Sequence, residues 1–189
     1  MRDAAWYVIQ VRTGHETIVC KHIEQACQLV DENSCDGVKV LRECFSPRYA
    51  YQRKRHGEWS DEEMPLLPGY VIAVTDDPWS LLNVLRSIPE FTRLLAMDKT
   101  FVPLDKDEKD WIERWTHEGD RTIPMSVAYK ECDKLVIIDG PLVGREAMIT
   151  RINRRKSVAH LEICVGQLTI HTTVGLAVLP EKPETEDGA

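Results

Sequence analysis

Five short apolar segments in the last third of the chain limit the folds open to it. Each is four to six residues long, and turn-favouring glycine, proline, asparagine or charged residues separate most of them. Short strands at this spacing predict a small closed β-barrel, because closure removes edges that a domain of about 50 residues would otherwise expose. The predicted strands are 135–138, 147–152, 158–163, 168–172 and 176–179.

The first part of the chain alternates strand and helix patterns. Aromatic and β-branched residues at 6–11 predict a buried strand, and apolar residues at helical spacing from Val19 to Val30 predict an amphipathic helix that ends before Asp36. This order predicts an α+β sandwich, in which helices pack on one sheet. The remaining predicted elements are strands at 38–45, 70–74 and 94–96, a hairpin or mobile loop at 48–63, a helix capped by Asp76 or Asp77 with Pro78 in its first position, and a helix at 106–116.

A change in charge separates the two parts. Residues 1–115 carry 15 basic and 20 acidic side chains, whereas residues 130–180 carry 7 basic and 5 acidic ones. The polar segment between them contains Gly119 and Pro124 and is typical of a linker. We therefore expect two domains, joined by a linker and followed by a disordered acidic tail. The boundaries are 1–115 and 129–181 for the domains, 116–128 for the linker and 182–189 for the tail.

Composition and missing motifs disfavour several classes of protein. A net charge of −7 excludes a uniformly basic nucleic-acid binder but leaves room for a local basic patch. No apolar run approaches the ~18 residues of a membrane span, and the N-terminus lacks a signal-peptide pattern. The six cysteines form no CxxC pair, and Walker, GxSxG and metal-ligand motifs are missing. We expect a reduced, cytoplasmic monomer that is not an enzyme and binds no cofactor, metal or membrane.

Motifs along residues 5–180 together resemble the NusG family of transcription elongation factors. The matching segments are 6–10 with Gly14 and Glu16, Leu-Pro-Gly-Tyr-Val at 67–71, Thr-Asp-Asp-Pro-Trp at 75–79, Arg-Ser-Ile-Pro at 86–89, and the core of a KOW motif at 139–144. The resemblance implies a NusG-type N-terminal α/β sandwich domain joined by a linker to a small five-stranded KOW β-barrel.

Two departures from the family pattern indicate a specialised paralogue. The KOW motif usually has a further glycine where this chain has Ala147. General NusG proteins have a Phe-Gly pair that contacts a small-subunit ribosomal protein, whereas this chain has Val165-Gly166, which argues against coupling to the ribosome. Together with the acidic first half, these departures make the chain most similar to LoaP among paralogues such as RfaH and LoaP.

The resemblance implies that the first domain binds RNA polymerase through an apolar depression. Aromatic anchors in a partly exposed pocket suit a protein interface. The alternative is that the aromatic side chains form the core. Strand alternation lets only one of Trp6 and Tyr7 face a given core, and the position of Trp79 near a helix start favours inward packing. The candidate contact residues are Tyr7, Phe45, Tyr49, Leu67, Pro68, Tyr70 and Trp79.

Basic side chains cluster around two strands and one hairpin of the predicted barrel. Three consecutive cations at 154–156 would present a compact positive surface to phosphates. Because double-stranded RNA is recognised mostly by shape and backbone, a hairpin stem suits this surface, and the resemblance to LoaP implies a leader RNA hairpin. A solvated turn is the alternative. The candidate RNA-binding residues are Arg145, Arg151, Arg154, Arg155, Lys156, Lys134 and His171.

A second basic group, formed by Arg53, Lys54 and Arg55, is a candidate for contact with the non-template DNA strand, with a solvated loop as the alternative. The preferred function is a processive antiterminator whose partners are RNA polymerase, an RNA hairpin and non-template DNA. A ribosome-associated or RNA-chaperone KOW protein without polymerase contact is the alternative, since KOW barrels also occur in ribosomal proteins.

Overall fold

The chain folds into two compact units of mixed helix and sheet. The computed structural model describes residues 4–33, 39–88, 91–94, 96–97, 100–101, 103–132, 134–165 and 168–180. Unit 1 comprises Met1–Pro47, Leu67–Arg121 and Cys164–Leu168, and unit 2 comprises Arg48–Leu66, Thr122–Ile163 and Thr169–Ala189. The segment Arg48–Leu66, which the sequence places in the first domain, therefore groups with unit 2. The predicted domain boundaries stay a prediction.

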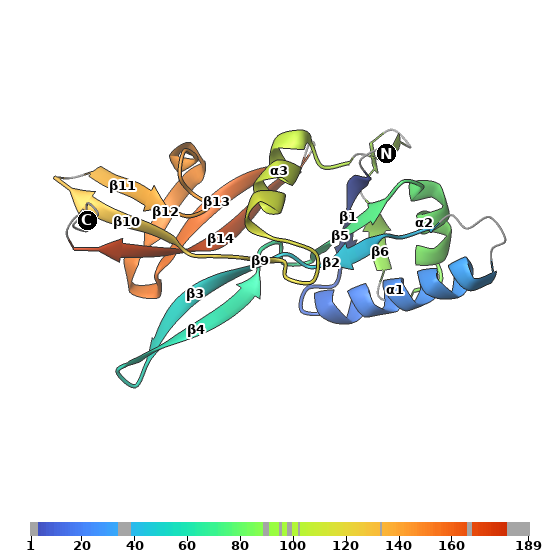
Figure 1. Ribbon diagram of the computed structural model, residues 1–189, viewed down its shortest axis with the longest axis horizontal. Helices are drawn as coiled ribbons and strands as arrows, with labels where there is room; N and C mark the ends of the chain where they lie inside the picture. Colours follow the sequence, from blue (N-terminus) through green and yellow to red (C-terminus); the bar gives the residue numbers. More distant parts are fainter. Residues whose placement is uncertain are drawn as a thin grey trace, which may run out of the picture. The chain divides into compact units, whose positions relative to one another are not determined.

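A four-stranded antiparallel sheet in the order β2-β5-β1-β6 forms the centre of unit 1. Two helices pack on one face, where Ile9 and Ala73 of the sheet join Ile23 and Leu85 of the helices in one buried apolar cluster (Figure 1). The elements of this layer pair are β1 (Ala5–Val11), β2 (Glu43–Phe45), β5 (Tyr70–Thr75), β6 (Phe91–Leu94), α1 (Glu16–Asn33) and α2 (Pro78–Leu85). Unit 1 also contains the short pair β7 (Ala96–Met97) and β8 (Thr100–Phe101), and α3 (Lys106–Trp115).

The other face of this sheet carries an aromatic and ionic cluster. The rings of Trp6 and Phe45 meet edge to face, with centroids 5.1 Å apart. The Arg121 guanidinium lies 4.4 Å from the Phe45 centroid and forms an ion pair with Glu43, and these two side chains are only 12% and 16% exposed. Lys109 of α3 lies 5.9 Å from the Trp6 centroid. Charged groups that are paired in this way can cover an aromatic surface without an unpaired buried charge.

A buried carboxylate joins the start of α1 to the turn before β5. The Glu16 carboxylate accepts a hydrogen bond from the Gly69 N–H at 2.7 Å, and the Gly69 carbonyl accepts one from the Val11 N–H at 2.8 Å. Burial raises the pKa of Glu16, but hydrogen bonds from the backbone at Gly69, Glu16 and Gly14 lower it by more, so its pKa lies below the usual value. The NusG-like segments at 6–16 and 67–71 are therefore held together by a charge-assisted hydrogen bond.

The helices of unit 1 begin at well-formed caps. The Asp77 carboxylate accepts hydrogen bonds from the N–H groups of Trp79 and Ser80, both at 3.1 Å, and Pro78 follows as the first helical residue of α2. This confirms the predicted aspartate-proline helix start and selects Asp77 as the cap. A capping box between Asp105 and Glu108 begins α3.

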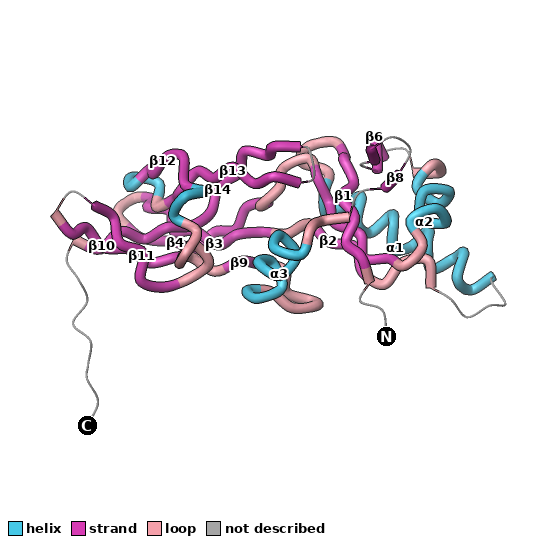
Figure 2. The backbone as a smooth tube through the Cα atoms, turned by 90° about the horizontal axis from the view of Figure 1, so that it is seen from above, coloured by secondary structure: helices cyan, strands magenta, loops and turns pink. Residues whose placement is uncertain are grey.

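Unit 2 contains a five-stranded sheet in the order β11-β10-β14-β13-β12. Its strands are β10 (Ser126–Glu131), β11 (Lys134–Asp139), β12 (Ile149–Asn153), β13 (Val158–Val165) and β14 (Leu168–Leu179), with 3-10 turns η1 (Glu146–Met148) and η2 (Arg154–Lys156). β10 pairs in parallel with β14, and Figure 2 shows β12, β13 and β14 side by side. Leu142, Leu161 and Leu176 are fully buried in this unit. Closure of the sheet into a barrel stays a prediction.

The segment predicted as a hairpin or loop is a hairpin fixed to this sheet. β3 (Arg48–Arg55) pairs with β4 (Glu58–Pro65) along its length and with the short strand β9 (Thr122–Ile123) on its other edge. The Thr172 hydroxyl donates to the Leu66 carbonyl. Gly175 of β14 lies so close to β3 that an added Cβ would stand 2.1 Å from the Ala50 carbonyl oxygen. The hairpin and the sheet therefore share a backbone-to-backbone contact that has no room for a side chain.

Other predicted elements differ from the structure. Only β2 lies in the described part of the predicted strand 38–45, and the predicted strand 147–152 begins as the turn η1. The two strands predicted at 168–172 and 176–179 are the single strand β14, in which Gly175 marks a close approach to β3 rather than a turn. The predicted linker 116–128 contains β9 and the start of β10. The predicted tail 182–189 lies outside the described residues.

Replacing Glu16 with glutamine tests the tie between α1 and the turn before β5. We expect Glu16→Gln to lower the free energy of unfolding at pH 7 by about 2 kcal/mol, since it removes the charge from a buried hydrogen-bonded acceptor. Because the folded-state pKa of Glu16 is lowered, its contribution is full above its unfolded pKa of about 4.3 and is lost as the pH falls through the folded value. In urea unfolding, the difference in the free energy of unfolding between the variant and the parent protein should therefore become smaller below pH 4. The control Glu118→Gln, at an exposed site, should leave the free energy of unfolding unchanged. Equal losses in both variants would contradict a stabilising role for the Glu16 carboxylate.

Replacing Gly175 with alanine tests the close approach of β14 to β3. We expect Gly175→Ala to lower the free energy of unfolding by about 3 kcal/mol, because the methyl group overlaps the Ala50 carbonyl and the Met125 side chain. Gly57→Ala at the hairpin turn is the matched control, since its Cβ meets no atom within 4 Å and only its φ of +94° opposes the change, at a cost of about 1 kcal/mol. If both variants lose the same free energy of unfolding in urea, the hairpin does not pack closely against β14 at Gly175.

Candidate nucleic-acid interface

The three consecutive cations of the sequence form an exposed turn at one end of the five-stranded sheet. Arg154, Arg155 and Lys156 make up η2, between β12 and β13. The Asn153 side-chain oxygen accepts a hydrogen bond from the Lys156 N–H at 3.1 Å, and Ser157 closes the turn with a φ of +52°. Within the described part of the chain, these three cations form no ion pair. The turn therefore presents its charges uncompensated to solvent.

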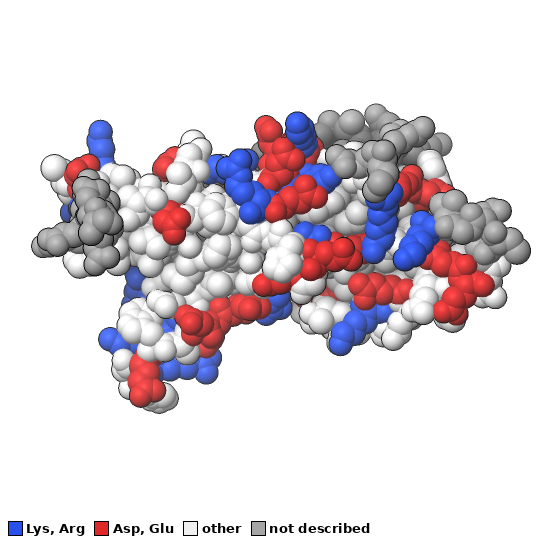
Figure 3. Space-filling view, viewed as in Figure 1, with Lys and Arg blue, Asp and Glu red and all other residues white. Residues whose placement is uncertain are grey.

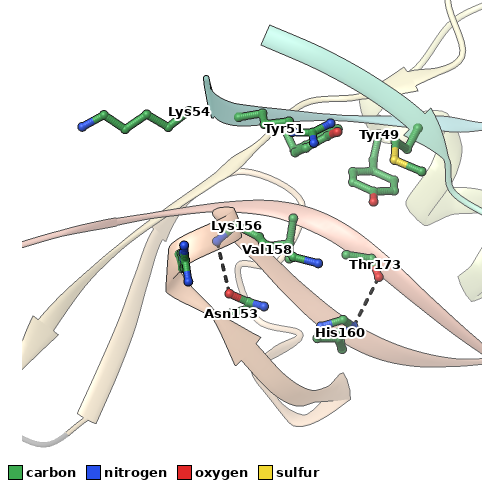
Figure 4. Close-up of a pocket in the computed structure, with 11 residues that line it drawn as sticks. Tyr49, Tyr51, Lys54, Asn153, Lys156, Val158, His160 and Thr173 are labelled. Carbon is green, nitrogen blue, oxygen red and sulfur yellow. Dashed lines mark hydrogen bonds between the residues drawn. The ribbon is translucent and has the colours of Figure 1, made fainter. Parts of the chain in front are cut away.

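A cavity of about 760 Å³ lies between this turn and the β3–β4 hairpin, all within unit 2. We call it the basic cavity. Figure 4 shows Tyr49 pointing from β3 toward Thr173 and His160, while Lys54 extends away from them. The lining residues are Tyr49, Tyr51, Arg53, Lys54 and Met64 from the hairpin, and Asn153, Arg155, Lys156, Val158, His160 and Thr173 from the sheet and its turn.

Hydrogen bonds hold the polar groups of the basic cavity in place. The Thr173 hydroxyl lies 3.4 Å from His160 Nδ1. The Tyr51 hydroxyl donates to Glu62 at 2.6 Å. Burial raises the pKa of Tyr49, and the hydrogen bond to Glu62 raises the pKa of Tyr51, so both phenols stay protonated at neutral pH.

The basic group on the hairpin is largely neutralised by the neighbouring strand. Glu62 of β4 lies 3.6 Å from Arg53 and 3.0 Å from Arg55, and the hydrogen bond from Tyr51, together with these cations, lowers the pKa of Glu62. The Lys54 ammonium lies 5.7 Å from the ring centroid of Trp59. Figure 3 shows basic and acidic side chains mixed over this hairpin. The candidates for DNA contact therefore differ: the two arginines share a carboxylate, whereas Lys54 lies on an exposed indole.

Only some of the candidates for RNA contact line the basic cavity or lie in its turn. Arg155 and Lys156 line the basic cavity, and Arg154 lies in the same turn. Arg145 is half-buried beside Met148, and His171 lies 3.4 Å from a carboxylate oxygen of Glu162. Arg151 and Lys134 are exposed on β12 and β11, outside the cavity.

The candidates for polymerase contact are also divided. Tyr7 packs against the helix-covered face of the unit 1 sheet, whereas Phe45 and Tyr70 lie on the opposite face by strand register. Phe45, Leu67 and Tyr49 are buried, and Tyr49 lies in unit 2, whereas Pro68 is exposed. The expectation that Trp79 packs inward is wrong: Trp79 is 59% exposed, because α2 directs Leu81 and Leu85 to the core instead.

Sequence reasoning missed several residues of the basic cavity. Tyr51, Met64, Asn153, His160 and Thr173 were not candidates, although all line it. A signal was present for the first of these, since Tyr49, Tyr51 and Arg53 alternate along β3 and so share one face. The contact of that face with β13 and β14 depends on pairing between segments more than 100 residues apart, which no local pattern contains.

Other kinds of site receive no support among the described residues. No group of three or more histidine, cysteine, aspartate and glutamate side chains there is arranged to hold a metal ion. Cys20, Cys27 and Cys44 are buried as free thiols, and burial, together with nearby acidic groups, raises the pKa of Cys27 to about 12. None of the helices there combines the length and the apolar character needed to cross a membrane.

Comparison with known proteins gives the chain a family. The solved structure described as "Domain interaction in Thermotoga maritima NusG" covers 90% of this chain and 93% of its own, with a TM-score of 0.56 and 18% identity, which shows a similar fold. The transcription termination/antitermination proteins NusG of Lactococcus lactis and Streptococcus pyogenes are 28% and 25% identical over 157 and 158 residues. Each alignment covers 82% of this chain, and 81% and 84% of the respective relative. The family model described as "Transcription termination factor nusG" matches residues 4–113, more than half of the chain, and the protein therefore belongs to the NusG family.

Proposed function

We propose that this protein is a specialised transcription elongation factor that acts as a processive antiterminator. In this proposal unit 1 binds elongating RNA polymerase and suppresses pausing and termination, while unit 2 contacts an RNA hairpin in the manner implied by the resemblance to LoaP. Non-template DNA is a further proposed contact of the hairpin, through Arg53, Lys54 and Arg55. The observation that carries the proposal is a match to the NusG family over residues 4–113 on the same chain as a basic turn whose cations form no ion pair with the described residues.

Family membership supports the role in transcription. The curated relatives are named as termination/antitermination proteins, and NusG-family factors act with RNA polymerase. The match covers the motifs at 6–16 and 67–71 that Glu16 and Gly69 join. These are structural groups of a binding domain, and no catalytic chemistry is proposed for them.

Exposure within unit 1 indicates where a polymerase would bind. Trp79 and Pro68 are exposed and Tyr70 is half-buried, so these side chains can be reached by a partner. Phe45 and Leu67 are buried and act as support. An exposed tryptophan at a helix start is the kind of anchor that dominates protein interfaces.

Charge within unit 2 supports the contact with RNA. The chain carries a net charge of −7, yet Arg154, Arg155 and Lys156 lie together in an exposed turn and form no ion pair with the part of the chain that the structure describes. A local positive surface on an acidic chain can hold a polyanion while the rest of the chain repels nonspecific contacts. The KOW assignment of this unit is part of the proposal and is based on the motif at 139–144.

Co-purification tests the polymerase contact. We expect the full chain to capture RNA polymerase core enzyme, and Trp79→Ala to weaken capture about tenfold, as loss of an interface anchor does. Trp59→Ala is the matched control, because Trp59 is 54% exposed but lies in unit 2. Failure to capture polymerase, or sedimentation with ribosomes instead, would overturn the proposal.

Salt-dependent RNA binding tests the basic turn. We expect Arg154→Ala combined with Lys156→Ala to weaken binding of a hairpin RNA and to reduce the slope of log affinity against log salt by about two, because two phosphate contacts are removed. Arg42→Ala combined with Arg48→Ala removes the same charge from exposed arginines that are paired with Asp76 and Glu63. An equal effect of the two double variants would show that only net charge matters.

A further inference from the structure

We propose that the basic cavity binds one unpaired nucleotide of the RNA, with the base inside the cavity and the neighbouring phosphates on the η2 turn. The inference rests on the proposed contact between unit 2 and RNA and specifies its ligand. It changes the expected mode of recognition, because a hairpin would be held by a loop or bulge nucleotide as well as by its stem.

The shape of the cavity suits a base and excludes a stem. Its volume of about 760 Å³ lies within the range of about 300–1,000 Å³ of small-ligand sites. Tyr49, Tyr51 and Val158 line the cavity but are only 6%, 9% and 5% exposed, whereas Met64, which lines it from the hairpin, is 45% exposed. Met64 and the exposed parts of the two tyrosines give an apolar surface against which an unstacked base packs, whereas a duplex keeps its bases stacked inside the helix and shows only backbone and groove edges.

The polar groups of the cavity match the edge of a base. Asn153 uses its oxygen to accept the Lys156 N–H, which leaves its NH₂ group to donate to a ligand. The Thr173 hydroxyl lies within hydrogen-bond distance of His160 Nδ1, and His160 can donate or accept through its second ring nitrogen. A simple anion site would have no use for an acceptor group or an aromatic wall, and sequence-selective RNA recognition depends on such groups.

The cations lie at the rim, where phosphates would be. Arg155 and Lys156 line the cavity from η2, and Lys54 lines it from the hairpin. None of these three forms an ion pair within the described part of the chain, so their charge is available to phosphates. Arg53 lies 3.6 Å from Glu62 and contributes less. Cations on two sides of an aromatic cavity match a chain that enters on one side, inserts a base and leaves on the other.

Three RNAs of one stem sequence separate base recognition from backbone attraction. The full-length protein would be titrated, by fluorescence anisotropy at two salt concentrations, with a hairpin, with the same hairpin carrying abasic loop nucleotides, and with the stem closed as a blunt duplex. The abasic loop keeps every phosphate and loses only the bases. We expect the intact hairpin to bind at least tenfold more tightly than either of the others.

A pair of histidine variants connects that preference to the cavity. We expect His160→Ala to reduce affinity for the intact hairpin about tenfold and to leave duplex affinity unchanged, because it removes a hydrogen bond that only a base makes. His117→Ala, an exposed histidine of unit 1, is the matched control. Thr173→Val keeps the β-branched shape, removes the hydroxyl that holds His160, and should reproduce the loss.

The outcomes distinguish this inference from the proposed function. Equal binding of intact and abasic hairpins would overturn the inference and leave RNA binding in place. Loss of duplex binding in His160→Ala would also overturn it, since the residue would then act on the backbone or on folding. No binding of any RNA would overturn the inference together with the RNA part of the proposed function, while polymerase capture would still decide the rest.

Discussion

The contact between β14 and β3 at Gly175 determines what unit 2 can present to a partner. A hairpin of two strands has little stability alone, and β3 is held by a short parallel pairing with β9, by the hydrogen bond from Thr172 to Leu66, and by this backbone approach. Because Gly175 has no side chain, the alternating face of Tyr49, Tyr51 and Arg53 can lie over β13 and β14. The hairpin wall of the basic cavity therefore depends on a glycine at position 175.

Strand pairing, more than composition, determines which basic side chains of this protein lie beside a carboxylate. On the hairpin, β4 places Glu62 and Glu63 beside the arginines of β3, so a segment that reads as basic in sequence is close to neutral at its surface. Within the described residues the η2 turn is in no β-ladder and its cations form no ion pair, and Asn153 and Ser157 fix its backbone without using a carboxylate. Positive potential is therefore concentrated at one end of the five-stranded sheet.

Local patterns predicted much of the fold and little of the candidate site. Period-2 and period-3.6 patterns located β1, α1, β5 and the Asp77-Pro78 start of α2, since these depend on residues close in sequence. The run through residues 173–175, which joins two predicted strands into β14, is stabilised by neighbours that sequence does not reveal. The prediction that Trp79 packs inward was wrong because a short helix has only one buried face, and Leu81 and Leu85 lie on that face. The basic turn could be predicted from three consecutive cations in the sequence, whereas the position of Tyr51 and Met64 opposite it could not.

The same long-range pairing gives unit 2 a definite order of assembly. The hairpin, residues 48–66, is translated first, but its partner β9 begins at Thr122 and the strand that packs beneath it ends at Leu179. Contacts between segments so far apart in sequence form late in folding, because the entropy cost of closing a long loop must be met before the contacts stabilise the fold. During synthesis the aromatic face of β3 therefore stays uncovered until β14 has been made. A truncated chain that ends before β14 would expose Tyr49 and Tyr51 to solvent and would have no basic cavity at all.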